Sequence, residues 1–443
     1  MTNLTWRSAV LHRQIGSIAI PMVLANLTVP LLGLVDTAVI GHLDSVVYLG
    51  GVAVGSMVVT LIYWLAGFLR MSTTGSTAQA LGRNDAVGQS QILLQGLGIA
   101  FSLGLMLVVF WQPIWWLARE LMQASVEVAE QAKVYFSIRI FGAPAALANL
   151  VFIGWLIGRQ KSQAVMRLVI LTNVVNITLD VVFVVFLGFG VAGAASATVC
   201  ADLFAMLFAG RLCFKQLPDI KQQIPFYRQW GAWQNIKPLL SMNRDILMRS
   251  LALQMCLAFM TAQAARLGDV TVAANAVLMN FLMLISYGLD GVAYSAEAMV
   301  GQSVGERNQQ RLKTSIAANA FWSLALAIIF AFGFAFGGAP LINLLTNLPD
   351  VQHVASEYLI YMIIMPLAGV GCFLLDGIFV GLTATKTMRN TMVLSSVGVF
   401  FPVWWATQSL GNHALWIAFL SFLAARSLTL GFCLIKRISP EKN

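Results

Sequence analysis

Twelve long apolar stretches constrain the fold of this 443-residue chain more than any other feature. A helix needs about 20 apolar residues to cross the hydrocarbon core of a bilayer. The stretches, which we interpret as membrane spans, are residues 15–40, 48–80, 91–112, 132–157, 165–186, 192–213, 245–266, 272–300, 316–338, 354–380, 391–409 and 414–434. The sequence therefore predicts an all-α polytopic membrane protein.

Composition supports the same fold class. Hydrophobic residues make up 59% of the chain, charged residues 10%, and the mean hydropathy is +0.80. A soluble domain carries about 25% charged residues, and no segment here is polar enough to form one. We expect no cleavable signal peptide. The five cysteines fall in or beside apolar runs without a CxxC pair, so neither a disulfide framework nor a zinc site is predicted.

Basic residues predict how the chain is oriented in the membrane. They follow every second span, at Arg83, Arg159, Lys161, Arg211, Lys215, Arg307, Arg311, Lys313, Lys386, Arg389, Lys436 and Arg437. The other side has little beyond Arg119, Lys133 and Arg266. By the positive-inside rule both termini are cytoplasmic, in a prokaryotic inner membrane. The same rule accounts for the net charge of +9 without nucleic acid. Trp111, Trp115 and Trp116 are predicted to anchor the opposite interface.

The two halves of the sequence resemble each other at an offset of about 223 residues. Matching positions include QALG at 79–82 with QSVG at 302–305, Gly154 and Gly158 with Gly377 and Gly381, and Gly188 with Gly411. Six spans per half give parallel repeats related by a pseudo-two-fold axis along the membrane normal. We expect an amino-terminal lobe (1–213), a basic cytoplasmic linker (214–243) and a carboxy-terminal lobe (244–443) around a central cavity. Such an arrangement suits alternating access.

Asp36 is the only charged residue in the first span. A carboxylate at the centre of a membrane helix costs about 2.5 to 3.5 kcal/mol on insertion scales, so it is normally neutralised, paired or hydrated. Counted from the loops, Asp36, Asp180 of the fifth span and Thr198 of the sixth lie at a similar depth. This shared depth predicts a proton or cation site.

Further polar residues share that region. Asn173, Asn176 and Asp180 lie on one helical face, and Asp202 follows Thr198 by four residues. Two close carboxylates can hold a proton near neutral pH, and with an amide and a hydroxyl they can instead bind a hard cation such as Na⁺. Interhelical hydrogen bonding remains the alternative role for the amides and Thr198.

Pro21 removes a backbone hydrogen bond four turns before Asp36 and can kink the first helix. The kink is either a hinge that responds to the charge of Asp36 or a static bend.

A second group of charges lies deeper in the predicted bilayer. Asp290 and Asp376 are predicted to lie in its inner half, at the depth of Arg70. Arg70 or Arg426 can pair with either acid, which favours structural ion pairs. A second cation site is the functional alternative. Glu297 is expected near the cytoplasmic interface, solvated.

Several motifs resemble the multidrug and toxic-compound extrusion (MATE) family, in its DinF-like branch, over essentially the whole chain. They are NLTVPLLGLVDTAVIGHL at 26–43, FLRMSTTG at 68–75, NRDI at 243–246, LDG at 289–291, LDG at 375–377 and GNHALW at 411–416. The resemblance implies a V-shaped, twelve-helix, two-lobe exporter driven by a proton or sodium gradient. It also implies an amino-lobe cation site at Asp36, Asn176, Asp180 and Thr198, and a helix bend at Pro21. Span 7 has Gln254 and Gln263 but lacks the central acid of another MATE branch, which favours the amino-lobe site.

These observations favour a monomeric antiporter that exports amphipathic, often cationic, small molecules and is coupled to H⁺ or, alternatively, Na⁺. No cofactor or fixed metal is expected. A flippase for a lipid-linked precursor is the alternative, although the embedded basic residues are few. The sequence contains neither an HExxH motif nor a GxxxxGK phosphate loop, so we expect neither an enzyme nor an ATP-driven pump.

Overall fold

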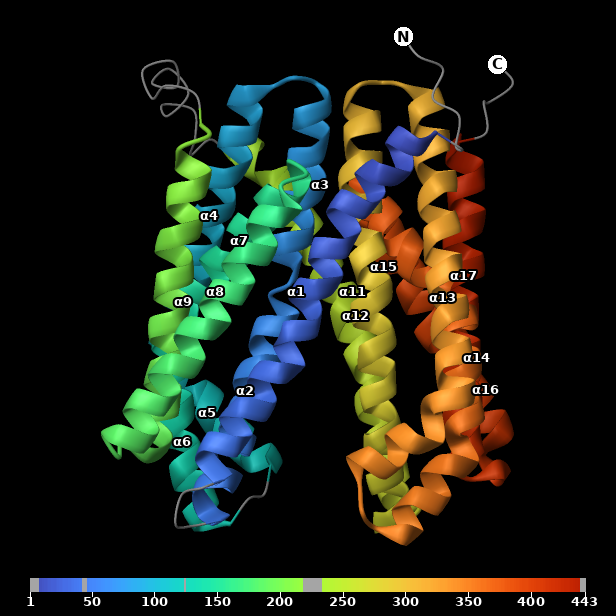
Figure 1. Cartoon of the computed structure of the whole chain (residues 1–443). Coiled ribbons are helices and arrows are strands. Elements are labelled where there is room, and N and C mark those ends of the chain that lie inside the picture. Colours follow the sequence, from blue (N-terminus) through green and yellow to red (C-terminus); the bar gives the residue numbers. More distant parts are fainter. Residues whose placement is uncertain (1–7, 42–45, 123–124, 218–232, 439–443) are drawn as a thin grey trace. The chain divides into compact units, whose positions relative to one another are not determined.

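The computed structural model describes residues 8–41, 46–122, 125–217 and 233–438. At positions 29–32, 34–41, 46 and 233–235 it describes the backbone alone. Helices make up nearly all of this described part, which contains no strand, and they run alongside one another within each half of the chain (Figure 1). The predicted all-α fold is confirmed.

The helices of the first half cover the first six predicted spans. They are α1 (Ala9–Gly41), α2 (Val46–Leu65), α3 (Phe68–Gly82), α4 (Ala86–Val109), α5 (Trp111–Met122), α6 (Val126–Phe141), α7 (Ala143–Gly158), α8 (Ser162–Asp180) with the π-helical turn η1 (Val181–Phe186), and α9 (Gly190–Phe214).

The helices of the second half cover the remaining six spans. They are α11 (Trp233–Arg266), α12 (Asp269–Gly305), α13 (Gln309–Leu345), α14 (Pro349–Gly381), α15 (Thr385–Ser395) with the π-helical turn η2 (Ser396–Phe400), α16 (Phe401–Thr407) with the 3₁₀ turn η3 (Gln408–Leu410), and α17 (Asn412–Ile438).

Most of these helices meet the requirements for a membrane span. Within the described residues, nine are long and apolar enough, or ten if the bent pair of α6 and α7 is one span. The two other predicted spans correspond to α1, where many side chains are not described, and to 391–409, which is divided among α15, η2 and α16.

Two further predicted spans are interrupted. The stretch 48–80 is two helices, because the chain turns at Ala66 and Gly67 between α2 and α3. The stretch 132–157 bends by 53° between α6 and α7, where Pro144 occupies the first turn of α7. Proline is tolerated there because the first turn of a helix has no internal acceptor for its amide.

The short helix α5 was not predicted as a separate element. Its Trp115 is only 7% exposed and packs on Phe136, with ring centroids 5.5 Å apart, whereas Trp116 is 64% exposed. The ring of Trp115 thus belongs to a buried cluster, and its predicted depth at the membrane interface stays a prediction.

The backbone repeats the duplication seen in the sequence. Three pairs of residues, each 223 apart, adopt the left-handed conformation at the same kind of turn: Asn84 and Arg307 (φ 54° and 54°), Gln160 and Thr383 (60° and 52°), and Gly188 and Gly411 (68° and 60°). Left-handed backbone is uncommon outside glycine, so this coincidence confirms the internal repeat.

The chain forms two compact units, each made of residues that lie close to one another in space. One is Leu24–Leu240, and the other combines Met1–Val23 with Ser241–Asn443. The division falls inside α1, two residues after Pro21. Within the second unit the start of α1 packs closely on α12, since a Cβ on Gly291 would lie 2.2 Å from the Val23 side chain. Ile15 and Ile18 are buried in the same cluster as Met299.

Candidate functional site

Three of the four predicted cation-site residues meet at the junction of α8 and α9. Asn176 and Asp180 lie one turn apart on α8 and are each 1% exposed, while Thr198 of α9 is half-buried. The Asn176 Nδ2 donates to Thr198 Oγ1 at 3.2 Å, and this hydroxyl donates to the Ala194 carbonyl at 3.0 Å. The structure thus forms a buried polar cluster of Asn176, Asp180 and Thr198, which we call the α8–α9 cluster.

The Asn176 amide lies between Thr198 and Asp180. With its two ends exchanged, Nδ2 donates to Asp180 Oδ2 at 3.1 Å and the amide oxygen accepts from Thr198 Oγ1 at 3.2 Å. An ionised carboxylate can only accept a hydrogen bond, whereas a protonated one can donate. An amide nitrogen facing Asp180 therefore suits its ionised form, and an amide oxygen facing it suits its protonated form.

Asp36 and Pro21, the other predicted residues, lie on α1. The side chain of Asp36 is outside the described residues, so its contact with Asp180 stays a prediction. Pro21 is buried, within a helix that is continuous from Ala9 to Gly41.

Asn173 joins α8 to α1. Its Nδ2 donates to Thr28 Oγ1 at 2.9 Å, and Thr28 donates to the Ala25 carbonyl at 2.7 Å. Asn173 precedes Asn176 by three residues, and Thr28 precedes Asp36 by eight. The part of α1 that carries Asp36 is thus hydrogen-bonded to the helix that carries the α8–α9 cluster.

Asp202, one turn beyond Thr198 on α9, forms an ion pair. Arg139 Nη1 of α6 lies 2.8 Å from Asp202 Oδ2, with both side chains largely buried. Tyr63 of α2 donates to the Arg139 carbonyl at 3.0 Å, and its ring lies 5.5 Å from the guanidinium carbon. Buried charges of this kind are normally paired, so Asp202 has a structural partner that the sequence did not identify.

A polar cavity of about 130 Å³ opens beside these residues, between α7, α8 and α9. Asn149, Thr172, Asn173 and Asp202 supply its polar lining. The Asn149 Nδ2 donates to the Asp202 carbonyl at 2.9 Å, but its Oδ1 is buried and has no hydrogen-bond partner among the described residues. At roughly 30 Å³ per water molecule, the cavity has room for about four.

The second half contains a separate charge cluster. Asp376 of α14 binds two arginines, Arg249 of α11 and Arg426 of α17. The predicted pairing with Arg426 is confirmed, while Arg249 is an additional partner. Asp290 of α12 accepts from Ser286 at 3.4 Å. Arg70 lies on α3, half-buried, in the other unit.

Glu297 differs from its predicted surroundings. Glu297 is only 3% exposed on α12, so its predicted solvation is wrong: close helix packing covers it, with its backbone carbonyl next to Gly381.

Within the described residues, no three His, Cys, Asp or Glu side chains lie close enough to bind a metal ion. The oxygens of Asn176, Asp180 and Thr198 are the groups that suit a proton or a hard cation.

Comparison with known proteins shows to which family the chain belongs. Residues 21–182 and 246–406 each match the MatE family model, one stretch in each predicted lobe. The chain belongs to the MatE family. It is therefore a membrane transporter and not an enzyme.

Curated relatives agree along the length of the chain. It is 44% identical over 414 residues to the DNA damage-inducible protein F of Escherichia coli (strain K12), covering 93% of this chain and 90% of that protein. It is 25% identical over 447 residues to the probable multidrug resistance protein NorM of Bacillus subtilis (strain 168), covering 96% and 95%. The similarity to the DinF-like branch of the family is thereby confirmed.

Solved structures confirm the fold. A MOP superfamily transporter from Pyrococcus furiosus Vc1 (DSM3638) matches with a TM-score of 0.87 at 20% identity, covering 98% of this chain and 97% of that one. A MATE protein in complex with MaD3S also matches with a TM-score of 0.87 at 20% identity, covering 97% and 96%. The protein is accordingly a multi-pass membrane protein with the twelve-helix MATE fold.

Proposed function

We propose that this MatE-family transporter is a secondary multidrug exporter that exchanges amphipathic compounds, including cationic ones, for protons by alternating access. The observation that carries the proposal is the α8–α9 cluster, which places a carboxyl, an amide and a hydroxyl in contact inside an apolar helix pair. Polar groups buried in membrane helices are costly and are usually functional. The names of the relatives, multidrug resistance protein among them, point to the same class of transport.

In this proposal Asp36 and Asp180 carry the coupling proton. Protonation of Asp180 exchanges an acceptor for a donor opposite the Asn176 amide, which changes the hydrogen-bonding pattern as far as Thr198. Asn173 and Thr28 link α8 to α1. A change at α8 thus has a direct route to the helix that carries Asp36.

Helix α1 is the proposed moving element, bending near Pro21. The missing amide hydrogen of Pro21 weakens the helix at that point. The division of the chain into two units falls two residues further on, so the two parts of α1 belong to different compact units. This favours Pro21 as the hinge between a segment held by α12 and a segment bonded to α8. The proposed lobes, 1–213 and 244–443, would then alternate around the 214–243 linker, with the part of α1 up to Val23 moving with the carboxy-terminal lobe.

The polar cavity beside Asp202 supplies a route for protons in the same proposal. Water held by Asn149, Thr172 and Asp202 would reach Asn173, one turn from Asn176. Asp202 is not itself a proton carrier in this route, since Arg139 pairs with it.

The lipid-linked-precursor flippase is less well supported. An anionic head group needs free cationic side chains in the cavity. Arg139 binds Asp202, and Arg249 and Arg426 both bind Asp376, so these three guanidiniums already have carboxylate partners.

Gradient-driven transport of ethidium in proteoliposomes tests the proposal. We expect a pH gradient to drive transport by the wild type, and Asp36→Asn and Asp180→Asn to reduce it to the level of protein-free vesicles. Asp350→Asn, at an exposed position in the first turn of α14, is the matched control and should transport normally. Transport that responds to a sodium gradient alone would replace H⁺ with Na⁺, and full activity in Asp36→Asn would remove that residue from the mechanism.

A further inference from the structure

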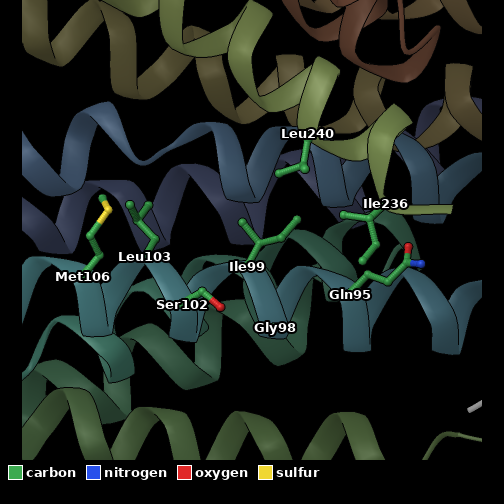
Figure 2. A pocket seen from close by; sticks show the side chains of 8 residues that line it. All are labelled: Gln95, Gly98, Ile99, Ser102, Leu103, Met106, Ile236 and Leu240. Atoms are coloured by element: carbon green, nitrogen blue, oxygen red, sulfur yellow. The ribbon is translucent and has the colours of Figure 1, made fainter. Parts of the chain in front are cut away.

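A second and larger pocket lies against one face of α4. It has a volume of about 550 Å³ and is lined by α4 residues between Gln95 and Met106 together with Ile236 and Leu240 of α11. All of these residues belong to the unit Leu24–Leu240. Figure 2 shows the Ile236 side chain directed toward α4, next to Gln95. Ligand pockets for small molecules have volumes of roughly 300 to 1,000 Å³, so this one is large enough for a drug-sized compound.

The lining has a simple chemistry. Among the described residues that line it, the side chains other than Gln95 and Ser102 are apolar or absent, and none is charged. Met106 is 49% exposed, whereas Gln95 is 6% exposed. The pocket therefore has an exposed apolar residue at one end and a buried amide at the other (Figure 2).

Gln95 has an unsatisfied donor. Its Nε2 is buried and has no hydrogen-bond partner among the described residues. A buried polar group without a partner is destabilising, and most such groups in native proteins are satisfied by protein or water. An amide that lines a ligand-sized pocket and lacks a partner is suited to donate a hydrogen bond to an acceptor atom of a ligand in that pocket.

We propose that this α4 pocket binds the uncharged, hydrogen-bond-accepting end of an amphipathic substrate, with Gln95 Nε2 donating to it. The inference rests on the proposed export function and narrows its substrate class. An apolar body occupies the face of α4 that carries Ile99 and Met106, and a carbonyl or ether oxygen reaches Gln95. Because none of the described lining residues is charged, the pocket selects through the acceptor and not through net charge.

Equilibrium binding to the full-length protein in nanodiscs tests this proposal without any gradient. Tritiated progesterone is a neutral amphiphile with carbonyl acceptors, and tetraphenylphosphonium is an apolar cation with none. We expect Gln95→Leu to weaken progesterone binding about three- to tenfold, the usual effect of losing one neutral hydrogen bond, and to leave tetraphenylphosphonium binding unchanged. Ile99→Trp, which fills the pocket, should weaken both. Empty nanodiscs correct for partition into lipid.

The control is Phe101→Trp, because Phe101 is 44% exposed on α4 and does not line the pocket. Unchanged binding in both Gln95→Leu and Ile99→Trp would overturn the proposal, as would an equal loss in Phe101→Trp. Folding is checked by thermal unfolding, where Gln95→Leu should be at least as stable as the wild type because it removes an unsatisfied donor.

The outcome is separable from that of the proposed function. Binding that follows these expectations in a protein that does not transport ethidium would refute the exporter alone. Proton-driven transport with unchanged progesterone binding in the variants would refute the α4 pocket alone.

Discussion

At the scale of single residues, the acids Asp180 and Asp376 have opposite surroundings. Asp180 faces a neutral amide, whereas Asp376 faces two guanidiniums. A carboxylate that pairs with two arginines has a structural partner on each side, which suits a structural role and not proton transfer. Of these two acids, Asp180 is therefore the better candidate for coupling.

Asp376→Asn tests the structural role. It removes the shared carboxylate and leaves Arg249 and Arg426 close together, so we expect a loss of about 3–5 kcal/mol of stability. The measurement is the midpoint of thermal unfolding in detergent. Adding Arg249→Met to Asp376→Asn should restore part of the loss. A stable Asp376→Asn protein that no longer transports ethidium would instead make Asp376 a functional residue.

The proposed proton route through the small cavity beside Asp202 leads to a second prediction at this scale. Asn149→Leu replaces an amide that lines the small cavity, so we expect slower proton-driven ethidium transport with unchanged ethidium binding. Losing the bond to the Asp202 carbonyl should cost only about 1 kcal/mol of stability. Ser162→Ala, at a buried position on α8 away from the cavity lining, is the control and should transport normally. An unchanged transport rate in Asn149→Leu would contradict the route.

Sequence reasoning could predict residues that share a helical face, but not most of the partners across helices. Spacings of three and four residues were enough to group Asn173, Asn176 and Asp180. The pairing of Asp202 with Arg139 joins positions 63 apart and depends on how α6 is rotated about its axis. The second partner of Asp376, Arg249, depends in the same way on the rotation of α11.

At the scale of elements, the length of apolar runs predicted where the helices lie but not where they break. The run 48–80 greatly exceeds the roughly 20 residues that a span needs, and the structure divides it near Gly67. Helix α5 and the π-helical turns η1 and η2 have no signal in hydropathy alone, because packing and local hydrogen bonding determine them.

Pro21→Ala tests the hinge in α1. Alanine restores a backbone donor and stiffens the helix, so we expect slower proton-driven ethidium transport with ethidium binding and stability maintained or increased. The control is Pro340→Ala in α13, an exposed proline inside a helix of the other half. Normal transport in Pro21→Ala would show that the proline produces a static bend. Equal losses in both variants would point to a general effect of removing prolines.

At the scale of the whole molecule, the same close contact between a glycine and a backbone carbonyl occurs in each half. A Cβ on Gly154 would lie 2.4 Å from the Arg70 carbonyl oxygen, and a Cβ on Gly377 would lie 2.5 Å from that of Ala293. Gly154 and Gly377 are 223 residues apart in the chain, and so are Arg70 and Ala293. Helices α3 and α7 therefore approach each other as α12 and α14 do. In both pairs the close approach is possible because the glycine has no side chain.

This equivalence predicts matched effects of substitution. Gly154→Ala and Gly377→Ala each force a backbone to move, so each should cost about 1–3 kcal/mol of stability. Their effects should be nearly additive in the double variant, because the two contacts share no residues and lie in different compact units. Gly210→Ala and Gly431→Ala are the controls, one in each unit, since their added methyl groups would meet neighbours only at 3.5 Å and 3.9 Å. Unequal costs in the thermal unfolding midpoint would show that the two halves, despite their common backbone, no longer depend on the same helix contact for stability.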